Sequence, residues 1–102
     1  MTENRYEAVA KWQKETFPKA SSLSKLAHLK LEVEELINDI KTDSHLKHLE
    51  FADCFLLLFG AAKAEGMTYK DILDCIDEKF DINQNRTWGT PNELGIVNHI
   101  KI

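Results

Sequence analysis

One segment of the chain is apolar on every side of a helix and yet carries two acids. Residues 49–62 read LEFADCFLLLFGAA, and Glu50 and Asp53 are the only charged residues in this run. A helix without a polar face is normally buried, and a buried carboxylate must be protonated, paired or bound to a cation. The segment therefore predicts a buried helix whose two acids serve a specific purpose.

Length and composition bound the fold. The chain has 102 residues, of which 43% are hydrophobic and 29% charged, with neither a repeat nor a low-complexity stretch. Such a composition is typical of a globular protein, and the length suits one domain with a small core. We expect residues 1–102 to form a single helical domain that is completed by oligomerisation.

Four helices can be read from the apolar spacing, and no stretch alternates with the period of a strand. They are expected from about Glu3 to Phe17, from about Ser22 to Lys41, from just after Ser44 to about Gly66, and from about Thr68 to Arg86. The fold class is therefore all-α, an antiparallel bundle of about four helices in which the second and third form a hairpin. An irregular tail is expected from about residue 88.

Small polar residues precede these helices and predict how the helices begin. Thr2 is the expected cap of the first helix, the serines at 21, 22 and 24 offer caps for the second, and the segment Thr42–Ser44 supplies the cap of the third. The second helix has a core stripe of Leu26, Leu29, Val33, Leu36 and Ile40, and the fourth has one of Ile72, Ile76 and Phe80. On the first helix, Trp12 is expected to pack in the core.

Two pairs of acids occupy consecutive helices. Glu32 and Glu35 are three residues apart, as are Glu50 and Asp53, and residues with this spacing share a helix face. If the second and third helices pack as a hairpin, the two pairs converge. Four carboxylates close together repel one another strongly unless a divalent cation neutralises them. A single Glu-x-x-Glu pattern is also typical of a solvated helix face, but two such pairs favour a metal site.

The expected metal follows from the donors. Carboxylate oxygens select hard cations, so Mg²⁺ is the predicted cofactor and Mn²⁺ a ready substitute. The Glu-x-x-His pairs of a di-iron bundle are absent from the sequence. His28 precedes Glu32 by one turn and is either an outer-shell partner or a structural histidine. Glu34 and Asn38 are expected to turn outward, and His45 and His48 are expected on the surface rather than in a zinc site.

A basic and aromatic stripe lies near the end of the chain. Lys79, Asn83 and Arg86 are spaced i, i+4, i+7 on the fourth expected helix, and Trp88 follows. The two cations could hold phosphates, while the amide and the indole could contact a sugar or a base. The alternative is an ordinary solvated helix end, where cations complement the helix dipole.

The net charge narrows the class of partner, and the cysteines and the amino terminus indicate the cellular compartment. The net charge of −4 equals the charge of the four acids alone, and it makes a nucleic-acid duplex or an anionic membrane an unexpected partner. Cys54 and Cys75 are expected as reduced core cysteines, with a single disulfide as the alternative. The amino terminus lacks an apolar signal region, and no stretch is long enough to span a bilayer. We expect a cytoplasmic protein.

The acid pairs, in the segments HLKLEVEEL and EFADCFLLLFGAA, resemble those of MazG-like all-α nucleoside triphosphate pyrophosphohydrolases. The pattern is Glu-x-x-Glu followed by Glu-x-x-Asp, and the resemblance covers nearly the whole chain. The later segment EKFDINQNRTWG and the tail toward Val97 and His99 resemble the dATP/dGTP pyrophosphohydrolase branch.

The resemblance implies a Mg²⁺-dependent enzyme that cleaves a (d)NTP between the α and β phosphates, giving a (d)NMP and pyrophosphate. It also implies a homodimer or homotetramer with sites near subunit interfaces. Lys79 and Arg86 would stabilise the phosphates, and Asn83 and Trp88 would contact the sugar or the base. Any one of the four acids could take the proton from water, and we assign this role to Glu35. The alternative function is a non-catalytic helical module that binds nucleotides or a partner protein.

Overall fold

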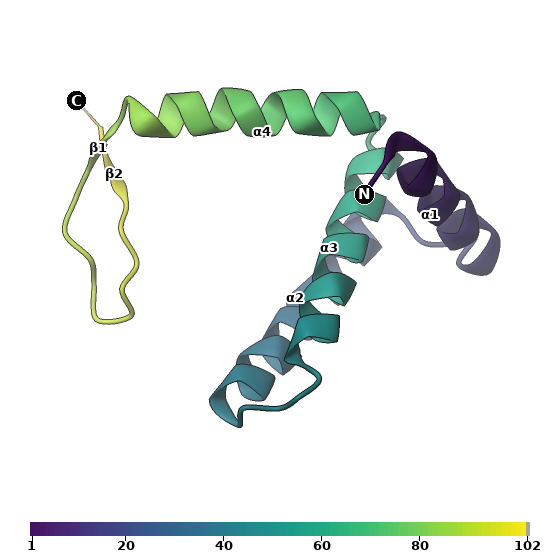
Figure 1. The fold of residues 1–102 in the computed structure, drawn as a ribbon, viewed down its shortest axis with the longest axis horizontal. Coiled ribbons are helices and arrows are strands. Elements are labelled where there is room, and N and C mark those ends of the chain that lie inside the picture. The colour runs from purple at the N-terminus through teal and green to yellow at the C-terminus, as the bar shows by residue number, and fades with distance from the viewer. Residues whose placement is uncertain (102) are drawn as a thin grey trace. The chain divides into compact units, whose positions relative to one another are not determined.

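A computed structural model describes residues 1–101 of the chain. It contains four helices, α1 (Glu3–Thr16), α2 (Ser22–Lys41), α3 (Lys47–Ala64) and α4 (Tyr69–Gln84), and two short strands, β1 (Thr87–Trp88) and β2 (His99–Ile100) (Figure 1). All four expected helices are present, each ending within two residues of its predicted end, and the predicted all-α class is confirmed. The chain divides into two compact units, residues 1–70 and residues 71–102.

Two of the helix starts follow the predicted capping chemistry. The Thr2 hydroxyl accepts a hydrogen bond from the Arg5 backbone N–H at 3.1 Å. Ser21 and Ser24 form a capping box at the start of α2, in which each side chain satisfies the backbone N–H of the other. These bonds pair donors that a helix start leaves unsatisfied, so the two helices begin where the sequence predicts.

The start of α3 differs from the prediction. Ser44 does not cap it; the residue before α3 is Leu46, whose backbone is already helical, with no side-chain cap. Ser44 Oγ instead accepts a hydrogen bond from the Leu46 N–H at 3.2 Å, and Asp43 adopts a left-handed φ of 51°. Because the Ser44 side chain is bonded within the turn, the turn continues for two more residues and α3 begins at Lys47.

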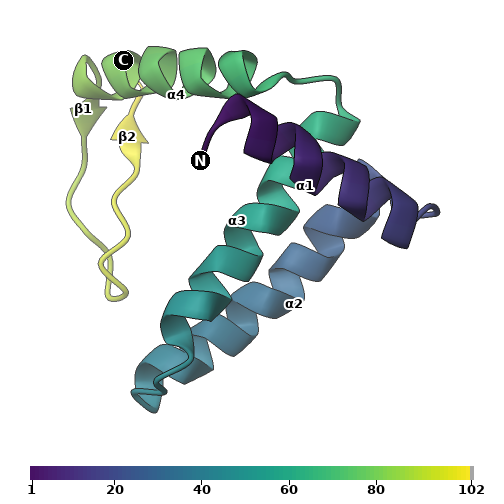
Figure 2. The ribbon, with the colours of Figure 1, turned by 45° about the vertical axis from the view of Figure 1, so that its right-hand side comes forward.

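The first unit is built on α3. Helix α2 runs alongside α3 as its antiparallel neighbour, and α1 also packs on α3 (Figure 2). Tyr6 is its most deeply buried large side chain at 1% exposure; its ring meets Phe59 edge-on and its hydroxyl donates to the Met67 carbonyl at 3.0 Å. These contacts join α1 to the C-terminal half of α3 and to the segment that follows it.

A close approach of α1 to α3 depends on one glycine. The Gln13 side chain is 7% exposed, and its Nε2 donates to the Leu56 carbonyl at 3.1 Å. A Cβ added at Gly60 would overlap the Gln13 amide oxygen. The absence of a side chain at Gly60 therefore makes room for the buried amide.

Much of the predicted core lies on the surface of a single chain. Phe55 on α3 is 57% exposed, so the expectation of a fully buried third helix is wrong for one chain alone. Trp12 is 58% exposed and meets Phe17 edge-on, so its predicted core position is also wrong. Cys54 and Cys75 are both free, as predicted, but Cys54 is only half-buried and Cys75 is exposed.

The second unit consists of most of α4 and a hairpin. Strands β1 and β2 pair antiparallel, with Thr87 opposite Ile100 and Trp88 opposite His99. The predicted irregular tail therefore contains one pair of short strands. The sequence did not indicate them, because strands of two residues are too short to show a periodicity. No helix in the described part of the chain combines the length and the apolar character that crossing a membrane requires.

Candidate active site

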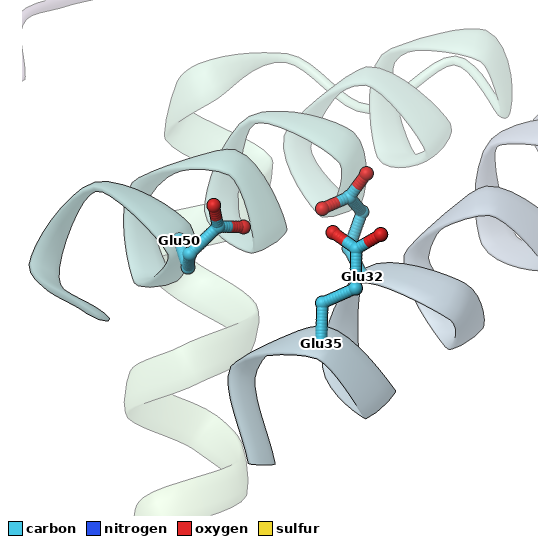
Figure 3. A group of neighbouring side chains, drawn as sticks. All are labelled: Glu32, Glu35 and Glu50. Atoms are coloured by element: carbon cyan, nitrogen blue, oxygen red, sulfur yellow. The ribbon is translucent and has the colours of Figure 1, made fainter. Parts of the chain in front are cut away.

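Helices α2 and α3 bring three carboxylates together. Glu32 and Glu35 extend from α2 and Glu50 from α3, and one oxygen from each lies within 4.8 Å of the others (Figure 3). The i, i+3 spacing places the first two on one face of α2, and the hairpin turns this face toward Glu50. We call these three residues the acidic cluster.

An open hollow of about 540 Å³ adjoins the cluster. Glu35 and Glu50 line it together with half-buried Asp39, one turn after Glu35 on α2. Glu34 and Asn38, expected to turn outward, are indeed exposed, but they also line this hollow. The site therefore offers more oxygen donors than the sequence analysis assigned to it.

The electrostatics of the cluster favour a bound cation. Repulsion from Glu32, and then a hydrogen bond shared with it, raise the pKa of Glu35. Burial is the first cause that raises the pKa of Glu50, followed by repulsion from Asp39. The shift of Glu35 reflects mainly repulsion between neighbouring negative charges, and that of Glu50 reflects mainly burial of its charge with repulsion added.

One oxygen of the cluster has no hydrogen bond. Glu50 Oε2 is buried and lacks a partner among the described residues. A buried carboxylate oxygen without a donor is costly, and a cation would satisfy it. All donors here are oxygens, so the residues present fit a hard divalent cation.

His28 contacts the cluster from one side. Its Nε2 lies 3.1 Å from Glu32 Oε1, one helical turn along α2. This contact favours the outer-shell role among the two that the sequence left open. His45 and His48 are exposed, as predicted, and neither belongs to a metal-binding group among residues 1–101.

Asp53 lies apart from the three clustered acids. It is exposed and outside the group of oxygens within 4.8 Å, although its charge contributes to raising the pKa of Glu50. Its assignment as a metal ligand stays a prediction.

Cys54 is a neighbour that the sequence analysis did not connect with the site: burial, and then the charge of Glu32, raise the pKa of its thiol. Cys54 follows Glu50 by four residues, and this helical spacing could have indicated that the thiol lies near the acids.

The predicted substrate-binding residues all belong to the second unit. Trp88 Nε1 donates to the Asn83 carbonyl at 2.9 Å, and the indole meets the His99 ring edge-on. The Asn83 side-chain oxygen is buried and has no hydrogen-bond partner among the described residues. Lys79 is exposed on α4, whereas Arg86 is half-buried and follows the end of that helix. The argument that put Lys79 and Arg86 on one helix face is therefore wrong for Arg86.

The arrangement of acids on a helical hairpin has a counterpart in a known family. The sequence pattern of the family described as dATP/dGTP pyrophosphohydrolase matches residues 5–102. The chain belongs to this family. A member of the dATP/dGTP pyrophosphohydrolase family is a nucleotide pyrophosphohydrolase, so the predicted enzyme class is confirmed over the non-catalytic alternative.

A solved structure is similar over nearly the full length. It is described as the MazG-like pyrophosphohydrolase of cyanophage S-2L bound to dGDP and three catalytic Mn²⁺ ions per active site. The two chains share 28% sequence identity with a TM-score of 0.78, and the match covers 99% of each. The predicted MazG-like all-α fold is thereby confirmed. The comparison with curated proteins found no match.

Proposed function

We propose that this pyrophosphohydrolase hydrolyses a deoxynucleoside triphosphate to the monophosphate and pyrophosphate, with Mg²⁺ as the cation and Mn²⁺ as a substitute. The observation that supports this most directly is the acidic cluster, three carboxylates from two helices with oxygens within 4.8 Å, in a chain of the dATP/dGTP pyrophosphohydrolase family. The homologue from the cyanophage binds dGDP and three Mn²⁺ ions. A divalent cation and a purine deoxynucleotide are therefore the ligands we assign to this site.

Glu32, Glu35 and Glu50 would hold the cations, and Asp53 would join them as a fourth ligand. Bound divalent cations supply neutralisation of the phosphate charge and acidify water close to them. Asp39 lies close enough to raise the pKa of Glu50 and contributes further negative charge to the same hollow. His28 orients the Glu32 carboxylate through their 3.1 Å contact.

Glu35 is our candidate for the general base. Hydrolysis adds water across the anhydride between the α and β phosphates: the hydroxyl joins one phosphate, the bridging bond breaks, and a proton must leave the attacking water. The carboxylate of Glu35 belongs to the acidic cluster, where a proton acceptor for this water is needed. Its exposure leaves it accessible to water.

The second unit would contact the substrate. We assign Lys79 and Arg86 to the phosphates, because cations stabilise the charge of the leaving pyrophosphate. Asn83 and Trp88 would contact the sugar or the base. The free amide oxygen of Asn83 and the exposed indole face of Trp88 are compatible with those contacts.

We also propose a homodimer or homotetramer. Large apolar side chains along α3 and α4 are exposed in a single chain: Leu49, Phe55, Leu58, Leu73, Ile76 and Phe80. Apolar surface of this extent is typical of a subunit interface, and a second copy is the partner that would cover it. A cytoplasmic location is part of the same proposal, supported by the two free cysteines.

The substrate assignment is tested by incubating the purified protein with a panel of ribo- and deoxynucleoside triphosphates and Mg²⁺. Separation of the products distinguishes the monophosphate and pyrophosphate from the diphosphate and phosphate. We expect dATP and dGTP to give the first pair of products. Release of single phosphates, or no turnover of any nucleotide in the panel, would refute the proposed reaction.

A further inference from the structure

We infer that His99 is a positioning residue, which fixes the orientation of the Trp88 indole for contact with the nucleoside part of the substrate. This inference rests on the proposed function, because that proposal assigns Trp88 to the sugar or the base. It adds a role for His99 and for the pairing of β1 with β2. All the residues that carry it belong to the second unit, residues 71–102.

Helix α4 holds the Trp88 indole at its polar end. The indole Nε1 donates a hydrogen bond to the Asn83 carbonyl at 2.9 Å. Asn83 lies in the last turn of α4, where carbonyls lack the usual partner within the helix. Its carbonyl also accepts the Arg86 backbone N–H at 3.3 Å. The indole therefore provides a second donor to this carbonyl, and the bond fixes the direction of the indole N–H.

His99 contacts the indole from another strand. Strand β2 pairs with β1 so that His99 lies directly opposite Trp88. The two ring centroids are 6.1 Å apart, and the ring planes meet at 81°. This edge-to-face arrangement is one of the two that aromatic rings prefer. With one contact at its N–H and another at the imidazole, the indole has little freedom to turn.

The backbone pairing keeps His99 in place beside the indole. The Gly89 N–H donates to the Asn98 carbonyl at 2.9 Å, so the two strands stay bonded beyond the pair of Trp88 and His99. The His99 side chain is half-buried, whereas Trp88 is 44% exposed. The imidazole is therefore packed, while much of the indole surface stays open to a ligand.

An indole that is already fixed binds a ligand more tightly than a mobile one. Immobilising one side chain during binding lowers the affinity by about two- to tenfold. Because His99 restrains the Trp88 indole in the folded chain, binding of the nucleotide does not have to immobilise it. A base or sugar that packs against the indole then gains the full benefit of the contact.

The test compares two probes in the presence of Mn²⁺: dGDP, which carries a nucleoside, and pyrophosphate, which does not. Calorimetry on the full chain measures the affinity of each. His99→Ala removes the imidazole, and His99→Phe keeps an aromatic ring in its place. The matched control is Ile100→Ala, which truncates the next residue of β2. Its side chain is exposed and points to the opposite face of the hairpin.

We expect His99→Ala to weaken dGDP binding by about two- to tenfold and to leave pyrophosphate binding unchanged. His99→Phe and Ile100→Ala should bind both probes like the wild type. In a Trp88→Ala background, His99→Ala should have no further effect, because a positioning residue acts through the residue that it positions.

The fluorescence of Trp88 reports the same restraint in the absence of metal and nucleotide. Trp12 is the other tryptophan of the chain, so Trp12→Phe leaves Trp88 as the only one. In that background we expect His99→Ala to lower the fluorescence anisotropy of Trp88 and His99→Phe to restore it. Ile100→Ala should leave the anisotropy unchanged. An equal fall in Ile100→Ala would overturn the inference, because it would indicate a general loosening of the hairpin.

The binding measurements have their own contradicting outcomes. Unchanged dGDP affinity in His99→Ala would overturn the inference, as would equal weakening of dGDP and pyrophosphate. Additive losses in the double variant would also overturn it, because His99 would then act independently of Trp88. If Trp88→Ala alone binds dGDP like the wild type, the assignment of Trp88 to the nucleoside is wrong. If the wild type binds neither probe with Mn²⁺, the proposed function itself fails, which is distinct from the other outcomes.

Discussion

At the scale of single residues, Glu50 is the clustered acid with a buried oxygen that lacks a hydrogen-bond partner among the described residues. It is the only member of the acidic cluster on α3. We expect Mn²⁺ to raise the melting temperature of the wild type, because a ligand that binds only the folded state stabilises it. In Glu50→Gln this rise should be largely lost. Thermal melts with and without Mn²⁺ measure the difference.

The matched control for this variant is Glu78→Gln, which removes the same charge from an exposed position on α4. Its Mn²⁺-dependent rise should equal that of the wild type. A full rise in Glu50→Gln would contradict the assignment of Glu50 as a ligand.

The raised pKa values of Glu35 and Glu50 predict how pH affects the metal-free protein. The folded state holds protons on these carboxyls more tightly than the unfolded state, whose Glu pKa is near the ordinary value of 4.5. The folded state therefore binds more protons, and its stability falls as pH rises above 4.5 through the raised pKa values. Denaturant unfolding in EDTA at a series of pH values measures this fall.

The pH effect of the cluster is isolated by comparison with a double variant, Glu35→Gln with Glu50→Gln. Other acids titrate in the same range, but they do so in both proteins. We expect the stability of the wild type relative to the double variant to decrease as pH rises from 4.5 toward neutrality. An increase over that range would show that the two acids are stabilised, not strained, in the metal-free fold.

The sequence predicted three acids that lie together in the structure, but it did not predict the orientation of the fourth, Asp53. The i, i+3 spacing is sufficient to bring Glu32 and Glu35 together, because both lie on one helix. Asp53 has the same spacing from Glu50, yet it is exposed and outside the group of three. The rotation of α3 about its axis decides this, and a helix that is apolar all round gives no signal of its rotation. For the same reason Cys54, also on α3, became a neighbour of the site only in the structure.

At the scale of elements, the contact between α1 and α3 depends on Gly60. A methyl group there would overlap the buried Gln13 amide oxygen. We expect Gly60→Ala to reduce the free energy of unfolding by about 1–3 kcal/mol, the usual cost of overpacking. Urea denaturation measures it.

A double-mutant cycle provides the control for Gly60→Ala. In a Gln13→Ala background the obstructing side chain is gone, so the same substitution should cost much less. An equal cost in both backgrounds would show that the effect arises within α3 and not from its contact with α1.

The helices themselves were largely predictable, since capping residues and apolar spacing act over one or two turns. Thr2 and the pair Ser21 and Ser24 fixed two starts correctly. The start of α3 was not predicted correctly. Ser44 bonds within a turn whose backbone at Asp43 is left-handed, and this sequence is compatible with several turn geometries. The β1–β2 pairing depends on residues eleven or more positions apart, which local pattern does not indicate.

At the scale of the whole molecule, the exposed face of α3 predicts self-association. Phe55 is more than half exposed in one chain, so a charge there should cost the isolated fold little. In an oligomer the same charge would be buried without a partner, which is costly. We expect the wild type to have the mass of a dimer or tetramer by light scattering and Phe55→Glu to be smaller. Lys30→Glu, on an exposed position of α2, is the control and should keep the wild-type mass.

A wild type that is monomeric at all concentrations would contradict the proposed assembly. Unchanged mass in Phe55→Glu would instead place the interface elsewhere on the chain. Both results would leave the acidic cluster intact, since its three members come from α2 and α3 of one chain.

The proposed hydrolysis of dATP and dGTP depends on the acidic cluster. The most direct measurement follows dGTP with Mg²⁺ in the wild type and in Glu50→Gln, with identification of both products. We predict dGMP and pyrophosphate from the wild type and no products when Mg²⁺ is removed by EDTA. In the variant we predict a rate lower by at least about 100-fold, because loss of a ligand should cost no less than the upper end of the range for an outer-shell partner. Equal rates of dGMP formation in the wild type and Glu50→Gln would contradict this dependence.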